Sequence, residues 1–150
     1  MHDPGSDRAD CTTPDAGRLE AIAVDAGAQA ARLVRRAHGK ALVIGTKSSQ
    51  TDAVTQTDVD TEALIRALLA KATPGAGVRG EEGGAEGVTE RLQWIVDPLD
   101  GTVNFLYGLP VCSVSIAAAF DGRFVAGPAP HRSGPHHRLV PALEAPRRRR

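Results

Sequence analysis

Aromatic residues are scarce in this chain, and their scarcity limits what its core can be. Of 150 residues, three are Phe, one is Trp and one is Tyr. The core must therefore consist mainly of Ala, Val, Leu and Ile. A chain of this length can form one domain with such a core.

Long apolar runs and cysteines are also few. No run reaches the roughly 20 apolar residues that a membrane-spanning helix needs, and residues 1–7 lack the basic and apolar segments of a signal peptide. Of the two cysteines, Cys11 lies in a polar segment and Cys112 in an apolar one. We therefore expect free thiols, a cytoplasmic location and no membrane partner.

The net charge of zero conceals an uneven distribution. Residues 128–150 hold six arginines and a single acid, Glu144, whereas acids outnumber bases in the rest of the chain. An acidic body lacks the basic surface that binds phosphate backbones, so we expect no nucleic-acid partner.

Composition divides the chain into three parts. Residues 1–16 are rich in Asp, Thr, Pro and Gly, and residues 128–150 hold half of the prolines. We expect a disordered leader and a disordered Pro/His/Arg tail at these places. Residues 17–127 are expected to fold. Helical patterns precede strand patterns there, which indicates an α+β or layered α/β arrangement with a mostly antiparallel sheet.

Apolar spacings of three and four predict a helix over 17–38. A second helix should begin near Thr57 or Asp58, where Thr57 and Asp60 resemble a capping box, and end at Pro74-Gly75. Its buried face should hold Leu64, Ile65, Leu68 and Leu69. Strands are expected over 41–44, 93–96, 111–120 and 123–126.

Residues 94–105 form the most informative stretch, Trp-Ile-Val-Asp-Pro-Leu-Asp-Gly-Thr-Val-Asn-Phe. Its apolar start predicts a strand that Pro98 breaks. Gly101-Thr102 can then open a turn or a helix, with backbone N–H groups available to a phosphate. The stretch therefore predicts a strand end that carries polar groups.

Asp97 and Asp100 would lie together at this strand end. Two carboxylates in one place repel each other unless a cation lies between them, and the Leu99 carbonyl could be a third oxygen ligand. An ordinary turn is the alternative, because Asp-Pro and Asp-Gly are common turn dipeptides.

Gly80-Glu81-Glu82-Gly83 supplies further carboxylates, although such a segment can also be a solvated acidic loop. If Glu81 joined the aspartates, every donor would be a hard oxygen, which favours Mg²⁺ over zinc. Thr102 could orient a metal-bound water or simply cap a turn. By residue type alone, Lys47 and Asp58 are ordinary surface or cap residues.

Together these motifs resemble the inositol monophosphatase family of Mg²⁺-dependent, lithium-sensitive phosphatases. The resemblance rests on residues 80–82 and 94–105 and on Lys47-Ser48-Ser49 with residues 52–58, in the family's order, and it covers roughly 17–127. The ending Thr102-Val103-Asn104-Phe105 is more similar to the inositol-phosphate branch than to the histidinol-phosphate or nucleotide-phosphate branches.

The resemblance implies a layered α/β/α/β/α sugar-phosphatase-like fold and the hydrolysis of a small polyol phosphate such as myo-inositol monophosphate. Glu81, Asp97 and the Leu99 carbonyl would bind one Mg²⁺. Asp97 and Asp100 would contribute to a second ion, and Glu81 to a third, more solvated one. Family members are often dimers, so a homodimer is one candidate state.

The remaining roles that the resemblance implies concern the attacking water and the substrate. Thr102, oriented by Asp58, would assist deprotonation of the water, and Lys47 would support the loop nearby. The phosphate ester would be held by Glu81, Asp100, Gly101 and Thr102.

Nothing after Gly127 resembles the second half of the family, which supplies another metal-binding aspartate and most of the substrate pocket. We therefore expect a homologue truncated after its first sheet, with impaired catalysis and a tail typical of a shifted reading frame. The alternatives are a non-catalytic fragment that retains metal binding, such as a pseudogene product, and a generic acidic α+β binding module.

Overall fold

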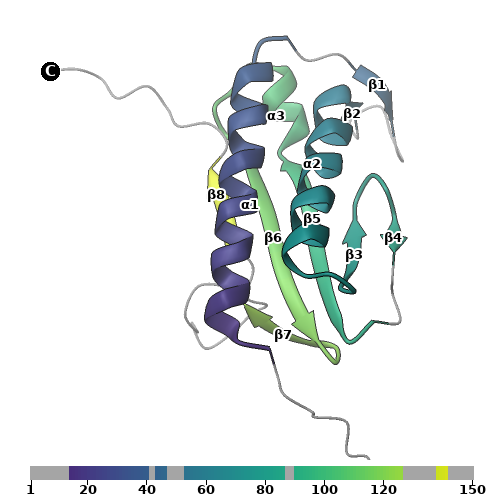
Figure 1. Ribbon diagram of the computed structural model, residues 1–150. Coiled ribbons are helices and arrows are strands. Elements are labelled where there is room, and N and C mark those ends of the chain that lie inside the picture. The colour runs from purple at the N-terminus through teal and green to yellow at the C-terminus, as the bar shows by residue number, and fades with distance from the viewer. Residues whose placement is uncertain (1–13, 41–42, 47–52, 87–89, 127–137, 142–150) are drawn as a thin grey trace, which may run out of the picture.

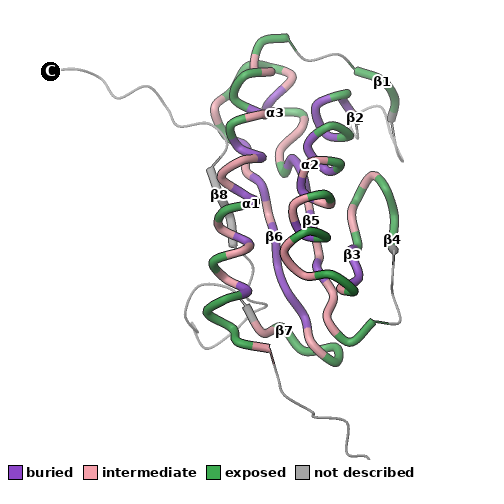
Figure 2. Tube along the Cα trace, in the orientation of Figure 1, coloured by how far each residue is buried: buried purple, intermediate pink, exposed green. Residues whose placement is uncertain are grey.

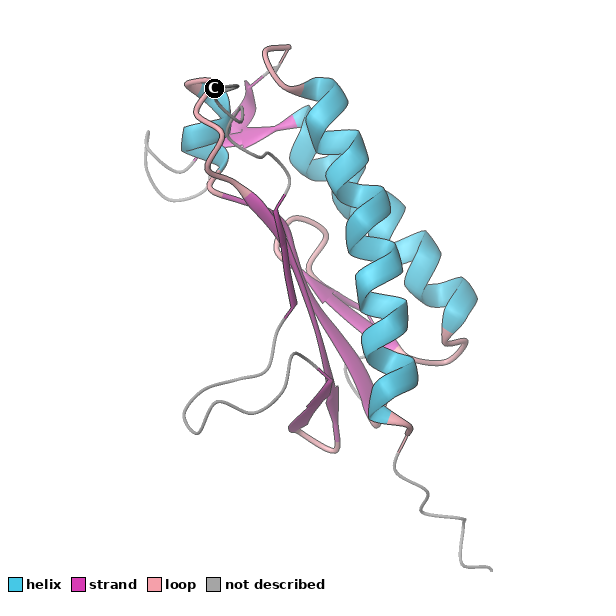
Figure 3. Cartoon of the chain, turned by 90° about the vertical axis from the view of Figure 1, so that its left-hand side faces the viewer, coloured by secondary structure: helices cyan, strands magenta, loops and turns pink. Residues whose placement is uncertain are grey.

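The computed structural model describes residues 14–40, 43–46, 53–86, 90–126 and 138–141, which form a layer of helices on one face of a sheet (Figures 1 and 3). The two long helices lie side by side on that face. None of the described helices is long and apolar enough to cross a membrane. The α+β class expected from the sequence is confirmed.

The first helix, α1 (Ala16–Ala37), matches its predicted range to within one residue at each end. Asp15 caps it, because its Oδ1 accepts a hydrogen bond of 2.9 Å from the N–H of Gly17. Small and aliphatic side chains make up its buried side, namely Leu19, Ala23, Ala26, Gly27, Ala30, Ala31 and Val34. Such a face packs closely without aromatic residues.

The second helix, α2 (Gln56–Ala72), starts just before the predicted position. Thr55 is its cap: Thr55 Oγ1 accepts from the N–H of Asp58 at 3.3 Å, and Asp58 Oδ2 accepts from the N–H of Thr55 at 2.8 Å. The predicted capping box of Thr57 and Asp60 is therefore wrong. The same spacing occurs two residues earlier, where the β-strand conformation of Thr55 suits a cap.

The main sheet has the strand order β4-β3-β5-β6-β7, and β8 also pairs with β6. Its strands are β3 (Gly77–Gly80), β4 (Ala85–Glu86), β5 (Leu92–Asp100), β6 (Ser113–Phe120), β7 (Arg123–Ala126) and β8 (Arg138–Pro141). A separate antiparallel pair consists of β1 (Val43–Thr46) and β2 (Ala53–Thr55). Among the described pairs, β3 and β5 run parallel and the others antiparallel, so the mostly antiparallel sheet is confirmed.

Two strands contradict the sequence prediction. Pro98 does not break β5, which runs on to Asp100 with a register shift between Asp97 and Asp100. Proline has no N–H to donate, and such an irregular stretch of the ladder accommodates it. The expected disorder of the tail is wrong for Arg138–Pro141, which pair with β6 as β8. Composition cannot reveal that β6 offers an edge to pair with.

The core lies between the helices and the sheet, and Figure 2 shows buried segments along β5, β6 and the inner sides of α1 and α2. Trp94 is fully buried, and its Nε1 donates to Thr73 Oγ1 at 2.9 Å. This bond joins the end of α2 to β5. On α2, Ile65 and Leu69 are buried as predicted, whereas Leu64 and Leu68 are only half-buried.

Candidate functional site

Parallel pairing of β3 with β5 places Glu81 beside Asp97. The last pair in their register is Gly80 with Val96, and each acid follows directly after one of these residues. Burial, the charge of Glu81 and a hydrogen bond with its carboxyl group raise the pKa of Asp97 from 3.8 to about 7. The two side chains are therefore close enough to share a proton.

Asp100 lies at the far end of the irregular stretch of β5. Its Oδ2 accepts from Ser113 Oγ at 3.3 Å, and its charge adds to the effect that raises the pKa of Asp97. The N–H of Leu99 donates to Asp97 Oδ1 at 3.2 Å, which acts in the opposite direction. The structure thus brings Asp97 within electrostatic reach of both Glu81 and Asp100.

Thr102 and Asp58 meet although they are 44 residues apart. Thr102 Oγ1 lies 2.9 Å from Asp58 Oδ1 and 2.9 Å from the carbonyl oxygen of Leu99, and can donate to either. Asp58 is only 2% exposed, and Thr55 holds its other oxygen. A buried carboxylate held in this way restricts the orientation of the threonine hydroxyl. The contact implied by the family resemblance is present.

Gly101 forms the turn that leads from β5 into the short helix α3 (Thr102–Leu106). Its φ is +88°, and a Cβ at this position would lie 2.8 Å from the carbonyl oxygen of Val111. Asn104 Nδ2 donates to that same carbonyl at 3.0 Å. The left-handed backbone and the close approach both favour glycine. This turn places the Thr102 hydroxyl within hydrogen-bond distance of Asp58.

The donors around Asp97 are of the kind that hard divalent cations bind. Glu81, Asp97, Asp100 and the Leu99 carbonyl all offer hard oxygen atoms. Within the described residues, no three His, Cys, Asp or Glu side chains form a group that could hold a metal ion as they stand. The negative charges of Glu81 and Asp100 repel that of Asp97, and a proton on Asp97 relieves this repulsion near neutral pH. A divalent cation among these acids would relieve the same repulsion.

One predicted site residue lies outside the described part of the chain, and one residue near the site was not predicted. Lys47 lies outside the described residues, so its role stays a prediction. Glu62 was missed: it is 2% exposed, and it accepts hydrogen bonds from the backbone N–H groups of Glu82 and Gly83. The sequence held one indication of Glu62: it lies four residues after Asp58 and so shares its helix face. Acids with this spacing are also common on solvent-exposed helices, so the spacing alone does not predict a site.

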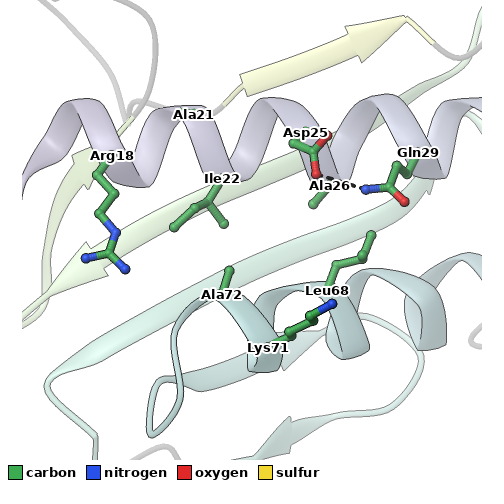
Figure 4. Close-up of a pocket in the computed structure, with 9 residues that line it drawn as sticks. All are labelled: Arg18, Ala21, Ile22, Asp25, Ala26, Gln29, Leu68, Lys71 and Ala72. Atoms are coloured by element: carbon green, nitrogen blue, oxygen red, sulfur yellow. Dashed lines mark hydrogen bonds between the residues drawn. The ribbon is translucent and has the colours of Figure 1, made fainter.

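A groove lies elsewhere, on the outer side of the helix layer between α1 and α2 (Figure 4). It has a volume of about 610 Å³. Its lining combines charged and polar side chains with an apolar floor, namely Arg18, Ala21, Ile22, Asp25, Ala26, Gln29, Leu68, Lys71 and Ala72. None of the predicted site residues lines it, so the acidic cluster and this groove are separate features.

Comparison with known proteins gives consistent matches. The model of a family described as the inositol monophosphatase family matches residues 15–129. The chain is 41% identical over 133 residues to the inositol-1-monophosphatase SuhB of Mycobacterium tuberculosis, an alignment that covers 77% of this chain and 46% of the relative. It is also 45% identical over 109 residues to an inositol-1-monophosphatase of Mesorhizobium japonicum, covering 71% and 41% respectively.

Solved structures show the same relationship. The extragenic suppressor protein SuhB of Bartonella henselae matches with a TM-score of 0.66 at 36% identity, over 71% of this chain and 42% of that one. An IMPase of Thermotoga maritima matches with a TM-score of 0.66 at 30% identity, over 72% and 41%. The chain thus spans less than half the length of these relatives.

Proposed function

This chain belongs to the inositol monophosphatase family, and we propose that it carries the first part of a Mg²⁺-dependent phosphomonoesterase site. The reaction is hydrolysis of a small polyol phosphate such as myo-inositol monophosphate by an activated water. The curated relatives that carry the name inositol-1-monophosphatase support this substrate class. The proposal rests on one observation: Glu81 and Asp97 lie next to each other, at the ends of the parallel strands β3 and β5.

In this proposal, Glu81, Asp97 and the Leu99 carbonyl hold one Mg²⁺, and Asp97 with Asp100 contributes to a second. Glu81 also helps to hold a third, more solvated ion. Bound Mg²⁺ would lower the pKa of the attacking water and neutralise charge on the phosphate. The pKa of Asp97, raised to about 7 by its acidic neighbours, supports an ion at this place.

Thr102 orients the water. Its single hydroxyl hydrogen points to Asp58 or to the Leu99 carbonyl, each 2.9 Å away. The free lone pairs of Oγ1 can therefore accept a hydrogen bond from the water, and the buried Asp58 carboxylate can draw proton density from the hydroxyl. The phosphate would lie between Asp100 and the N–H groups of Gly101 and Thr102.

Metal binding without turnover is the second candidate. It is favoured by the acidic cluster itself, because Glu81, Asp97 and Asp100 can hold a cation without any substrate-binding group. Turnover separates this candidate from the first, whereas metal binding is common to both.

The test compares the parent with Asp97→Asn, which removes one charge from the acidic cluster at constant size. Phosphate release from myo-inositol 1-phosphate should require Mg²⁺ and fall at least about a hundredfold in the variant, as expected for loss of a metal ligand. Asp25→Asn is the matched control, because Asp25 is an exposed acid on α1 that accepts from Gln29.

Mg²⁺ binding without phosphate release would favour the second candidate. Absence of both from the parent would overturn the proposed function.

A further inference from the structure

We propose that Glu62 is a positioning residue, which holds the Glu81-bearing loop where its carboxylate can meet Asp97. This inference rests on the proposed function, in which Glu81 is a metal ligand. Glu62 lies on α2 four residues after Asp58 and four before Arg66. Residues with this spacing share one helix face, so a single face of α2 carries all three side chains.

Glu62 binds the backbone of the loop that follows β3. Its Oε2 accepts from the N–H of Glu82 at 2.7 Å, and its Oε1 accepts from the N–H of Gly83 at 2.8 Å. Glu81 directly precedes these two residues. Hydrogen bonds from backbone N–H groups to a buried carboxylate are among the stronger ones in proteins, so this contact restrains the loop on the C-terminal side of Glu81.

The two glycines that flank the acids make room for this carboxylate. A Cβ on Gly80 would lie 2.1 Å from Glu62 Oε1, and a Cβ on Gly83 would lie 2.6 Å from the same atom. Real Cβ atoms do not come so close to an oxygen. The glycines of Gly80-Glu81-Glu82-Gly83 therefore leave room for the Glu62 carboxylate, and a side chain at either position would displace it from its present place.

Arg66, on the next turn of α2, also binds Glu62 and the loop. Its Nε donates to Glu62 Oε1 at 2.8 Å, and its two terminal nitrogens donate to the carbonyl oxygens of Gly84 and Val78 at 2.6 and 3.3 Å. The guanidinium thus balances the buried charge of Glu62 and also holds β3 and the far end of the loop.

One helix consequently positions both halves of the site. Asp58 holds the Thr102 hydroxyl, and Glu62 holds the loop of Glu81, one helical turn further along. A shift of α2 would move both groups together. Glu62 itself reaches backbone N–H groups and Arg66 in the described structure, so it acts through Glu81.

The test measures binding of Mn²⁺, as a probe for Mg²⁺, to the full chain by the loss of the electron paramagnetic resonance signal of free Mn²⁺. Glu62→Gln should weaken binding at least tenfold, in line with other residues that orient metal ligands. Asp60→Asn is the control: it removes an acid on the same helix that accepts only from the Gln56 side chain among the described contacts, and its affinity should stay within about twofold of the parent.

Gly80→Ala provides a second, independent variant, because it displaces the Glu62 carboxylate without removing it. If both changes act through one contact, the double variant should bind no more weakly than the weaker single variant. Parent-like affinity in Glu62→Gln would overturn the positioning role, as would fully additive losses in the double variant.

Failure of the proposed function is distinguishable from failure of this inference. If the parent does not bind Mn²⁺, the function fails, and NMR then decides the positioning role without metal. Glu62→Gln should speed amide exchange at Glu82 and Gly83 and shift the ¹³C resonance of the Glu81 carboxyl group. Unchanged exchange and an unchanged Glu81 resonance would refute the inference.

Discussion

Replacing Asp97 with Asn should remove a large part of the pH dependence of stability that the acidic cluster creates. Burial and the neighbouring acids raise the pKa of Asp97 from 3.8 to about 7 in the folded chain. The folded state therefore binds this proton more tightly than the unfolded state does. The resulting stabilisation is fully present below pH 3.8 and is lost as the pH rises to about 7.

The size of the effect follows from this interval. At 1.36 kcal/mol per pH unit, the difference between 3.8 and about 7 corresponds to at most about 4 kcal/mol. Asp97 is partly exposed, however, and water screens its interactions with the other acids. We therefore expect the parent to lose about 1–2 kcal/mol of its free energy of unfolding over this range, relative to Asp97→Asn.

Urea unfolding of both proteins, from about pH 4 to about pH 8 in the presence of EDTA, measures this difference. Asp25→Asn should follow the parent at every pH, because Asp25 is exposed and lies on α1. Adding Mg²⁺ at the highest pH should restore stability to the parent more than to Asp97→Asn. A stability difference between the parent and Asp97→Asn that does not change with pH would refute the reasoning.

Two further predictions concern the elements that present the site. Gly101→Ala should lower the free energy of unfolding by about 2 kcal/mol, because Gly101 has a φ of +88° and its Cβ would lie 2.8 Å from the Val111 oxygen; a loss below about 0.5 kcal/mol in thermal unfolding would contradict this. Thr55→Ala should cost about 1–2 kcal/mol in urea unfolding, because it removes the helix cap and one partner of the buried Asp58. An unchanged unfolding midpoint would show that the cap does not stabilise α2.

The sequence pattern was sufficient to predict a helix where the periodicity of the segment itself decides its structure. The helix over 17–38 is visible in the spacing of small and aliphatic residues, and α1 spans Ala16–Ala37. The end of α2 before Pro74-Gly75 is equally local, since proline cannot continue a helix. Its start was misplaced because two capping boxes compete within six residues, and only one of the threonines adopts a strand conformation in the folded chain.

The sequence by itself determined which chemical groups are available: acids, a threonine and a glycine turn within two short motifs, in the order typical of one phosphatase family. Only the tertiary structure decided that these groups meet. The register of β3 against β5 sets Glu81 beside Asp97, α2 carries Asp58 to Thr102, and Glu62 reaches back to hold the acidic loop. Strand register and helix placement depend on burial summed over the whole core, and no single segment contains that information.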